Sequence, residues 1–199
     1  MLPLEQQIRT AAQLDQWLKY EKAQYGVGFR HVVGAWLGVS EKGILWRHQF
    51  YLRHAEYHTN AHHKIRAAYY RFRLRRIETR CLLSIPLNTC AMGLRIMHLG
   101  LVRINPNCQI GKDCRFHVNT VLAAKGISAQ SPCLGDDIIV GVGAVIVGGV
   151  HIANHVAIGA NAVVTKDITE ENVAVAGVPA KIVSRNGAVA WVEGNKDKN

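Results

Sequence analysis

The chain has 199 residues and a formal net charge of +10, with 49% hydrophobic and 19% charged residues. This composition excludes a disordered or fibrous chain, and the length suits one domain preceded by a small helical module. The longest apolar stretches are about half as long as a bilayer span, and no basic segment leads into an apolar one near the start. We therefore expect a cytoplasmic protein with no signal peptide and no membrane span.

Residues 1–82 are predicted to form a helical module. Pro3 and Glu5 are residue types that favour a first helical turn, and the apolar residues that follow are near helical spacing, which predicts a helix over about residues 4–22. The glycine-rich apolar stretch of residues 26–40 is expected to be a loop or a short packed segment. One or two further helices are expected over residues 43–81.

Most of the positive charge lies in this module. Residues 1–80 hold 14 of the 24 Lys and Arg residues but only 6 of the 14 Asp and Glu residues. Residues 47–80 also carry five histidines, and aromatic residues are interleaved with the basic ones. Such a surface is either a solvated helical face whose aromatic side chains pack on the rest of the protein, or a contact for an anionic membrane surface, a glycan or nucleic acid.

Beyond residue 84, an aliphatic residue recurs at every sixth position. Ten of the eleven positions reached in steps of six from Ile104 to Val164 are Val, Ile, Leu or Phe. A second series, four residues further on in each unit, holds small or medium-sized residues such as Cys108 and Cys114. This period matches neither a helix nor a strand but is typical of a parallel β-helix, in which each unit supplies one wall. We expect about five coils over residues 85–170.

Two departures from this period predict loops, which in such folds often border a binding face. Ser128 replaces an aliphatic residue within an expected extruded loop over residues 125–131. The second departure is a spacing of eight between Ile96 and Ile104, and His98 lies in this irregular corner.

The cysteines and the late histidines predict no special chemistry. The five cysteines lack paired spacing, so we expect a reducing compartment, with Cys108 and Cys114 buried as small apolar side chains. His151 and His155 have no third ligand at a compatible spacing, so no metal site is expected.

The repeat and its ending resemble the hexapeptide-repeat acyltransferases, particularly their serine acetyltransferase-like branch. The resemblance covers residues 84–184 and rests on Ile85–Asn88, Ile96–Gly100, Ile104–Gly111, Ile158–Asp167 and Ala176–Lys181. It implies a left-handed β-helix prism over residues 83–184, a closing segment and tail over residues 185–199, and a homotrimer with sites between neighbouring prisms. It also implies acetyl transfer from acetyl-CoA to a hydroxyl group, without a metal.

The same resemblance implies the site residues. It places the general base at His98, because imidazole can accept a proton from a hydroxyl near neutral pH. His117 is expected either to line the same cleft one coil away or to be structural. Cofactor contacts are implied at Val142, Ala160, Thr165, Lys166 and Lys181, where the two lysines can meet CoA phosphates.

Four side chains of the serine enzymes are missing from this chain. Acids that orient the base and hold serine align with Ser84 and Met97, and an Arg–His pair aligns with Gln130 and Ser131. An amino-acid acceptor such as serine carries an ammonium group that needs a carboxylate partner, and these acids are missing. The sequence therefore favours a sugar hydroxyl of a surface polysaccharide or its precursor as the acceptor. Serine O-acetylation in cysteine biosynthesis and a non-catalytic trimeric scaffold are the alternatives. A polysaccharide role also favours an anionic membrane surface over nucleic acid as the partner of residues 47–80.

Overall fold

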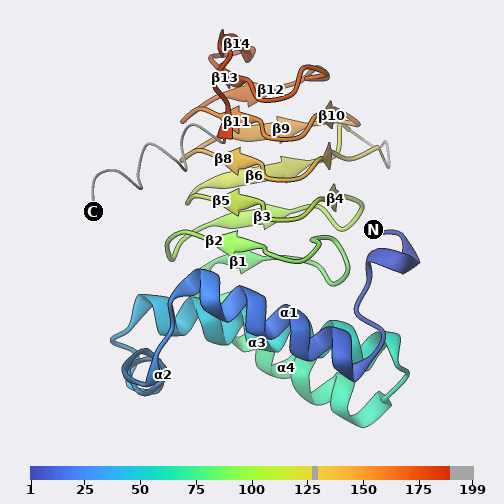
Figure 1. Ribbon diagram of the computed structural model, residues 1–199, viewed down its shortest axis with the longest axis vertical. Helices are drawn as coiled ribbons and strands as arrows, with labels where there is room; N and C mark the ends of the chain where they lie inside the picture. The colour runs from blue at the N-terminus through green and yellow to red at the C-terminus, as the bar shows by residue number, and fades with distance from the viewer. Residues whose placement is uncertain (127–129, 189–199) are drawn as a thin grey trace.

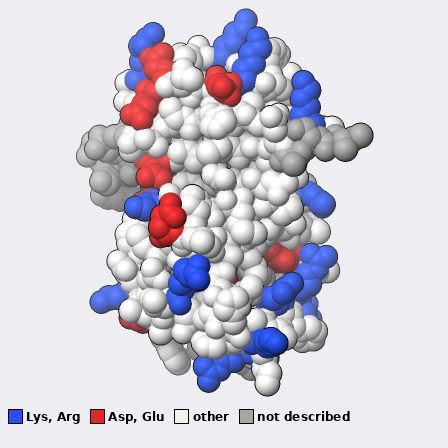
Figure 2. All heavy atoms as spheres, turned by 90° about the vertical axis from the view of Figure 1, so that its right-hand side faces the viewer, with Lys and Arg blue, Asp and Glu red and all other residues white. Residues whose placement is uncertain are grey.

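The computed structural model describes residues 1–126 and 130–188, and it consists of a helical base with a β-prism standing on it (Figure 1). The base holds a short 3-10 helix, Leu4–Gln6, and four α-helices: α1 Ala11–Tyr25, α2 Phe29–Trp36, α3 Glu41–Asn60 and α4 Lys64–Cys81. Figure 2 shows Lys and Arg side chains gathered over this base. The predicted order of a helical module followed by a β-prism is confirmed.

The predicted start of the first helix is wrong. Helix α1 begins at Ala11 instead of near residue 4, because Thr10 caps it. Thr10 Oγ1 accepts a hydrogen bond from the Gln13 backbone N at 3.2 Å. In return, Gln13 Oε1 accepts a hydrogen bond from the Thr10 backbone N at 3.0 Å. Residues 26–40, expected to be a loop or a short packed segment, contain the eight-residue helix α2. Gly26, with φ 59°, ends α1 in a left-handed conformation and thereby separates the two helices.

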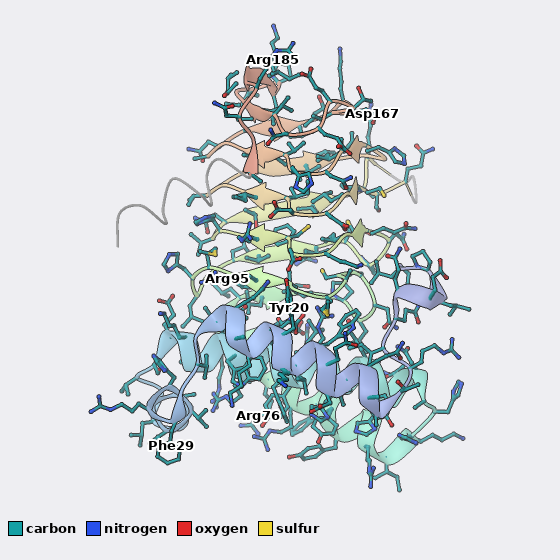
Figure 3. All side chains as sticks on the ribbon, in the orientation of Figure 1. Tyr20, Phe29, Arg76, Arg95, Asp167 and Arg185 are labelled. Atoms are coloured by element: carbon teal, nitrogen blue, oxygen red, sulfur yellow. The ribbon has the colours of Figure 1, made fainter. Side chains whose placement is uncertain are left out.

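A buried arginine that is ion-paired within the base also bonds to the first coil of the prism. Arg53 of α3 is fully buried and donates hydrogen bonds to the carboxylates of Glu21 and Glu56. The same guanidinium donates to the backbone carbonyls of Cys90 at 2.9 Å and Ala91 at 2.8 Å. Figure 3 labels Tyr20 of α1 and Arg95 of the prism where the base meets the prism. The position of the helices relative to the prism is therefore set by specific contacts.

The prism has three walls of stacked short strands. The first wall holds β1 Leu83–Ser84, β3 Val102–Ile104, β6 Thr120–Ala123, β9 Val145–Val147 and β12 Val163–Val164. The second wall holds β4 Gln109–Ile110, β7 Cys133–Leu134 and β10 His151–Ile152. The third wall holds β2 Arg95–Ile96, β5 Arg115–Phe116, β8 Ile139–Val140, β11 Ala157–Ile158, β13 Ala174–Ala176 and β14 Lys181–Ser184. The five strands of the first wall correspond to the expected five coils.

The residues of the six-residue period fill the interior of the prism. Each of the ten Val, Ile, Leu and Phe residues in the series from Ile104 to Val164 is at most 3% exposed. Cys108 and Cys114 are buried free thiols, as expected, and burial raises the pKa of the Cys108 thiol to about 12. Ser128, the exception in the series, lies outside the described residues, as does the middle of the expected loop.

The last strand closes the upper end of the prism. All strand pairs of the walls are parallel except that of β13 and β14, which is antiparallel, with Ala176 opposite Lys181. Ala188 is buried, and its backbone N donates to the His155 carbonyl at 2.9 Å. Of the closing segment and tail expected over residues 185–199, residues 185–188 belong to the described part of the chain.

Candidate active site

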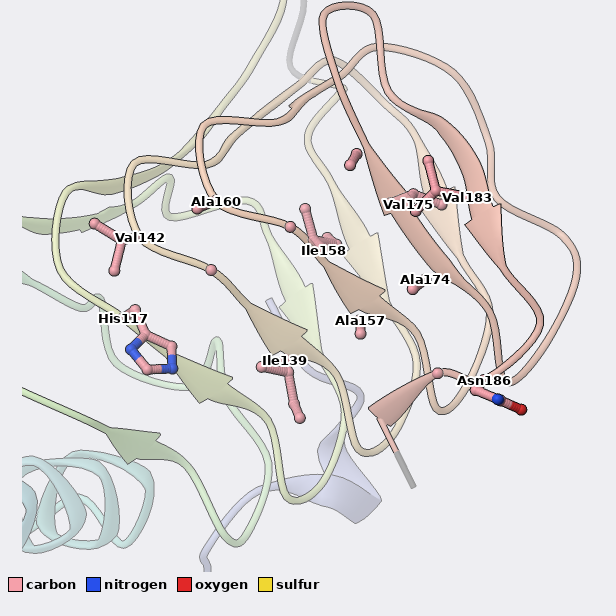
Figure 4. Close-up of a pocket in the computed structure, with 14 residues that line it drawn as sticks. His117, Ile139, Val142, Ala157, Ile158, Ala160, Ala174, Val175, Val183 and Asn186 are labelled. Atoms are coloured by element: carbon pink, nitrogen blue, oxygen red, sulfur yellow. The ribbon is translucent and has the colours of Figure 1, made fainter. Parts of the chain in front are cut away.

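An apolar groove runs along the third wall from β5 to β14, with a volume of about 390 Å³ (Figure 4). His117, Val142 and Ala160, three of the predicted site residues, line it. Small residues and backbone form much of the remaining surface, because neighbouring coils approach each other closely here. A Cβ atom at Gly141 would lie 2.7 Å from the Ile158 carbonyl oxygen and 2.8 Å from the Ala160 backbone N.

The imidazole of His117 lies at one end of this groove, away from Asn186, in Figure 4. His117 directly follows β5, and its backbone N donates to the Val140 carbonyl at 3.0 Å. Burial, with a smaller contribution from the neighbouring His98, lowers the pKa of His117 below its usual value of 6.5. The neutral imidazole is therefore the favoured form of His117 at pH 7.

His98 lies beside His117, with their ring centroids 6.3 Å apart. It occupies the irregular corner after β2, where the Met97 backbone N donates to the Phe116 carbonyl at 2.9 Å. The His98 side chain is 60% exposed, so a molecule from solvent can reach it. The structure thus brings the two predicted catalytic histidines together next to the groove.

Glu41, from the helical base, is the carboxylate beside His98. Its Oε1 atom lies 3.6 Å from His98 Nδ1 and accepts a hydrogen bond from the Leu99 backbone N at 2.7 Å. Neither Ser84 nor Met97 supplies an acid, whereas the structure brings the Glu41 carboxylate to the His98 ring.

The packing of α2 against α3 places Glu41 at this corner. Ser40 caps α3, accepting a hydrogen bond from the Gly43 backbone N at 3.2 Å, which makes Glu41 the first helical residue. A Cβ atom at Gly43 would collide with the His31 carbonyl oxygen of α2, so this glycine permits the close helix contact. A capped helix with an acid in its first turn is visible in the sequence, but its contact with His98 depends on tertiary packing.

The other predicted cofactor residues lie away from the groove lining. Thr165 and Lys166 follow β12 of the first wall and are exposed. Lys181 is also exposed and opens β14, the strand that contributes Val183 to the groove. The cofactor roles of these three residues stay predictions.

Two of the sequence-based expectations concern metal binding and contact with a membrane. Within residues 1–126 and 130–188, the His, Cys, Asp and Glu side chains form no group of three or more that could hold a metal ion. None of the helices in that part of the chain is both long and apolar enough to cross a bilayer. Contact of residues 47–80 with an anionic membrane surface stays a prediction.

Comparisons with known proteins find similarity to serine acetyltransferases. No family model matches the chain. The serine acetyltransferase of Mycobacterium tuberculosis is 31% identical over 113 residues, which are 54% of this chain and 49% of that protein. The chain therefore spans about half the length of the curated relatives that it matches first.

Solved serine acetyltransferases share the fold. The Neisseria gonorrhoeae enzyme in complex with serine aligns with a TM-score of 0.61 at 20% identity, covering 85% of this chain and 69% of that one. The Brucella abortus enzyme in complex with coenzyme A aligns with a TM-score of 0.57 at 20% identity, covering 88% of this chain and 74% of that one. The prism is accordingly a left-handed parallel β-helix of the hexapeptide-repeat type.

Proposed function

We propose that this chain, which is serine acetyltransferase-like in sequence and in its left-handed β-helical fold, is an acetyl-CoA-dependent O-acetyltransferase. The observation that carries the proposal is the position of His98 between the Glu41 carboxylate and His117, at the end of an apolar groove. A general base, an orienting acid and a cofactor channel are the parts that direct acyl transfer to a hydroxyl requires.

The reaction proceeds by direct attack in this proposal. Because Nδ1 of His98 faces Glu41, Nε2 accepts the proton of the acceptor hydroxyl, and the hydroxyl oxygen forms a bond to the thioester carbonyl carbon. The carbon–sulfur bond then breaks, and the CoA sulfur leaves with the proton that His98 returns. Glu41 acts as a positioning residue, holding the ring and stabilising the imidazolium that forms between the two proton transfers.

The groove suits the pantetheine arm of acetyl-CoA. Its lining is largely apolar, and close coil stacking leaves backbone groups near Val142 and Ala160 within reach of amides on the arm. His117, in its neutral form, donates an N–H toward the thioester carbonyl oxygen, where negative charge develops. We propose that Lys181, which begins β14 at the upper end of the groove, meets a CoA phosphate.

Serine is the acceptor that the comparisons support better than a sugar. The similar proteins are named serine acetyltransferases, and one similar structure holds serine. Glu41 also removes one argument against a serine enzyme, since it can replace the orienting acid that is missing at Ser84. The acid missing at Met97, which would hold the ammonium group of serine, still favours a sugar hydroxyl as the second candidate.

A trimer would complete the site. The groove is open along one side, and apolar residues at its edge, including Val142 and Val183, are exposed. A neighbouring prism packed on this wall would cover them and close the channel. Light scattering on the purified chain should therefore give three times the mass of one chain, and a monomer that acetylates its acceptor at full rate would refute this part of the proposal.

An acceptor panel tests the function directly. Free CoA release is measured with acetyl-CoA and, in turn, L-serine, simple sugars and nucleotide sugars. Turnover with L-serine supports the leading candidate, and turnover with a sugar alone supports the second one. A chain whose melting temperature CoA does not change, and which acetylates none of these compounds, would instead be the non-catalytic scaffold.

A further inference from the structure

A second cavity, of about 460 Å³, opens between α3 and α4 on the helical base. Four arginines line it: Arg47 from α3 and Arg73, Arg76 and Arg80 from α4. The three α4 residues are spaced by three and four positions, which places them on one face of the helix. We call this cavity the arginine pocket. It is formed by the base alone and does not include the candidate active site on the prism.

Aromatic rings, and not carboxylates, hold two of these guanidinium groups in place. Arg73 Nη1 donates a hydrogen bond to Tyr69 Oη at 3.0 Å, and its guanidinium carbon lies 5.0 Å from the ring centroid of Tyr51. The guanidinium carbon of Arg76 lies 5.7 Å from the ring centroid of Phe72. Stacking on a ring orients the group while leaving most of its N–H donors directed elsewhere.

The positive charge of the pocket has no acidic partner among residues 1–126 and 130–188. No Asp or Glu lines the cavity, and the ion pairs found in the described residues include none of the four arginines. The acid closest along α4, Glu78, instead accepts a hydrogen bond from the Ile85 backbone N at 3.1 Å and lies near Arg75.

Arg47 also carries one buried donor without a partner among the described residues. Arg47 Nε is inaccessible to solvent and has no hydrogen-bond partner in the described structure. A buried N–H of a charged group without an acceptor is costly, and four guanidinium groups around one cavity repel each other. A multiply charged anion in the cavity would offset this repulsion.

We propose that the arginine pocket binds a ligand that carries a diphosphate group. Guanidinium forks match phosphate oxygens in pairs, and a diphosphate offers enough oxygens and charge for several forks, whereas a single carboxylate engages only one. Tyr69 and Phe72 are exposed at the edge of the pocket and provide an apolar surface for the rest of the ligand. The diphosphate can belong to a free small molecule or to a lipid headgroup.

Calorimetric titration of the full chain with inorganic pyrophosphate tests the proposal. We expect one pyrophosphate per chain, bound at least about tenfold more tightly than inorganic phosphate. The variant R73Q/R76Q should weaken the binding of pyrophosphate at least about tenfold. The variant R71Q/R75Q, which removes the same charge from α4 outside the pocket, should bind like the unchanged chain.

Two further experiments extend the test. One distinguishes a lipid headgroup from a free small molecule as the source of the diphosphate, and the other excludes binding in the cofactor groove. Co-sedimentation with phosphatidylcholine vesicles that contain a polyprenyl diphosphate supports a lipid source, and pyrophosphate binding without co-sedimentation supports a free ligand. Because CoA itself carries a diphosphate, K181Q serves as the control for the groove.

The proposal is overturned if neither probe binds, if both arginine double variants behave alike, or if K181Q and not R73Q/R76Q abolishes binding. R73Q/R76Q should transfer acetyl groups at the rate of the unchanged chain. Failure of the acetyltransferase proposal can therefore be distinguished from failure of the diphosphate proposal.

Discussion

The carboxylate of Glu41 and the imidazole of His98 meet where the helical base touches the prism, with Oε1 and Nδ1 3.6 Å apart. The two residues belong to different parts of the fold, since Glu41 begins α3 and His98 lies in a corner of the first coils. The same oxygen accepts a hydrogen bond from the Leu99 backbone N, which fixes the carboxylate relative to the corner. This relationship makes the helical base part of the proposed catalytic machinery.

Replacing Glu41 with Gln should lower kcat by about tenfold or more while leaving KM for acetyl-CoA unchanged. The amide keeps the shape of the side chain but no longer stabilises the imidazolium that forms during the transfer. Steady-state kinetics measure both parameters. D15N, which removes an exposed acid from α1, is the matched control and should retain full activity. Equal rates for E41Q and the unchanged chain would remove Glu41 from the mechanism.

Replacing His98 with Ala should lower turnover at least about 100-fold, the loss that is typical when a general base is removed. Because the side chain is largely exposed and outside the groove lining, binding of CoA to H98A should remain. Rapid-quench measurement of the transfer step, together with a CoA titration, separates the two effects. An H98A variant with full turnover would contradict the assignment of the base, even if the chain proved to be an acetyltransferase.

Acid should destabilise the helical base through His54. Burial, with a smaller contribution from His58, lowers the pKa of His54 from 6.5 to about 4, and the ring is stacked 4.5 Å from that of Tyr70. The unfolded chain takes up this proton near pH 6.5, whereas the folded chain takes it up only near pH 4. The contribution of neutral His54 to the free energy of unfolding is therefore complete above pH 6.5 and is lost as the pH falls toward 4. H54F keeps a stacked ring but cannot be protonated, so its melting temperature should fall less over this range. The argument is rejected if the melting temperatures of H54F and the unchanged chain fall by the same amount over this pH range.

Replacing Arg53 with Met should lower the free energy of unfolding by about 3–5 kcal/mol, because it leaves the buried carboxylates of Glu21 and Glu56 without a cationic partner. Urea denaturation followed by circular dichroism measures this loss. The triple variant R53M/E21Q/E56Q removes the unpaired charges as well and should recover part of the stability. A single variant as stable as the unchanged chain would show that the pairs do not hold the base on the prism.

The prism could be predicted from the sequence because its core depends on a local repeat. Each coil places the same position inward, so the burial of Ile110 or Val164 follows from spacing alone. The helical base has no such repeat, and the wrong prediction there concerns the start of α1, which depends on the Thr10 cap. The contact of Glu41 with His98 was missed for the same reason, since it joins residues that only the tertiary fold brings together.

The assignment of the groove as the CoA channel leads to a last prediction. Ala160 is exposed and lines the groove, so a Trp side chain there would fill the channel without entering the core. A160W should therefore raise KM for acetyl-CoA at least about tenfold, whereas its melting temperature without ligand stays close to that of the unchanged chain. T165W is the informative comparison, because Thr165 is a predicted cofactor contact that lies on the first wall instead of in the groove. If T165W and not A160W weakens the binding of acetyl-CoA, the cofactor runs along a different face of the prism, and the roles of Val142 and Ala160 in cofactor binding are wrong.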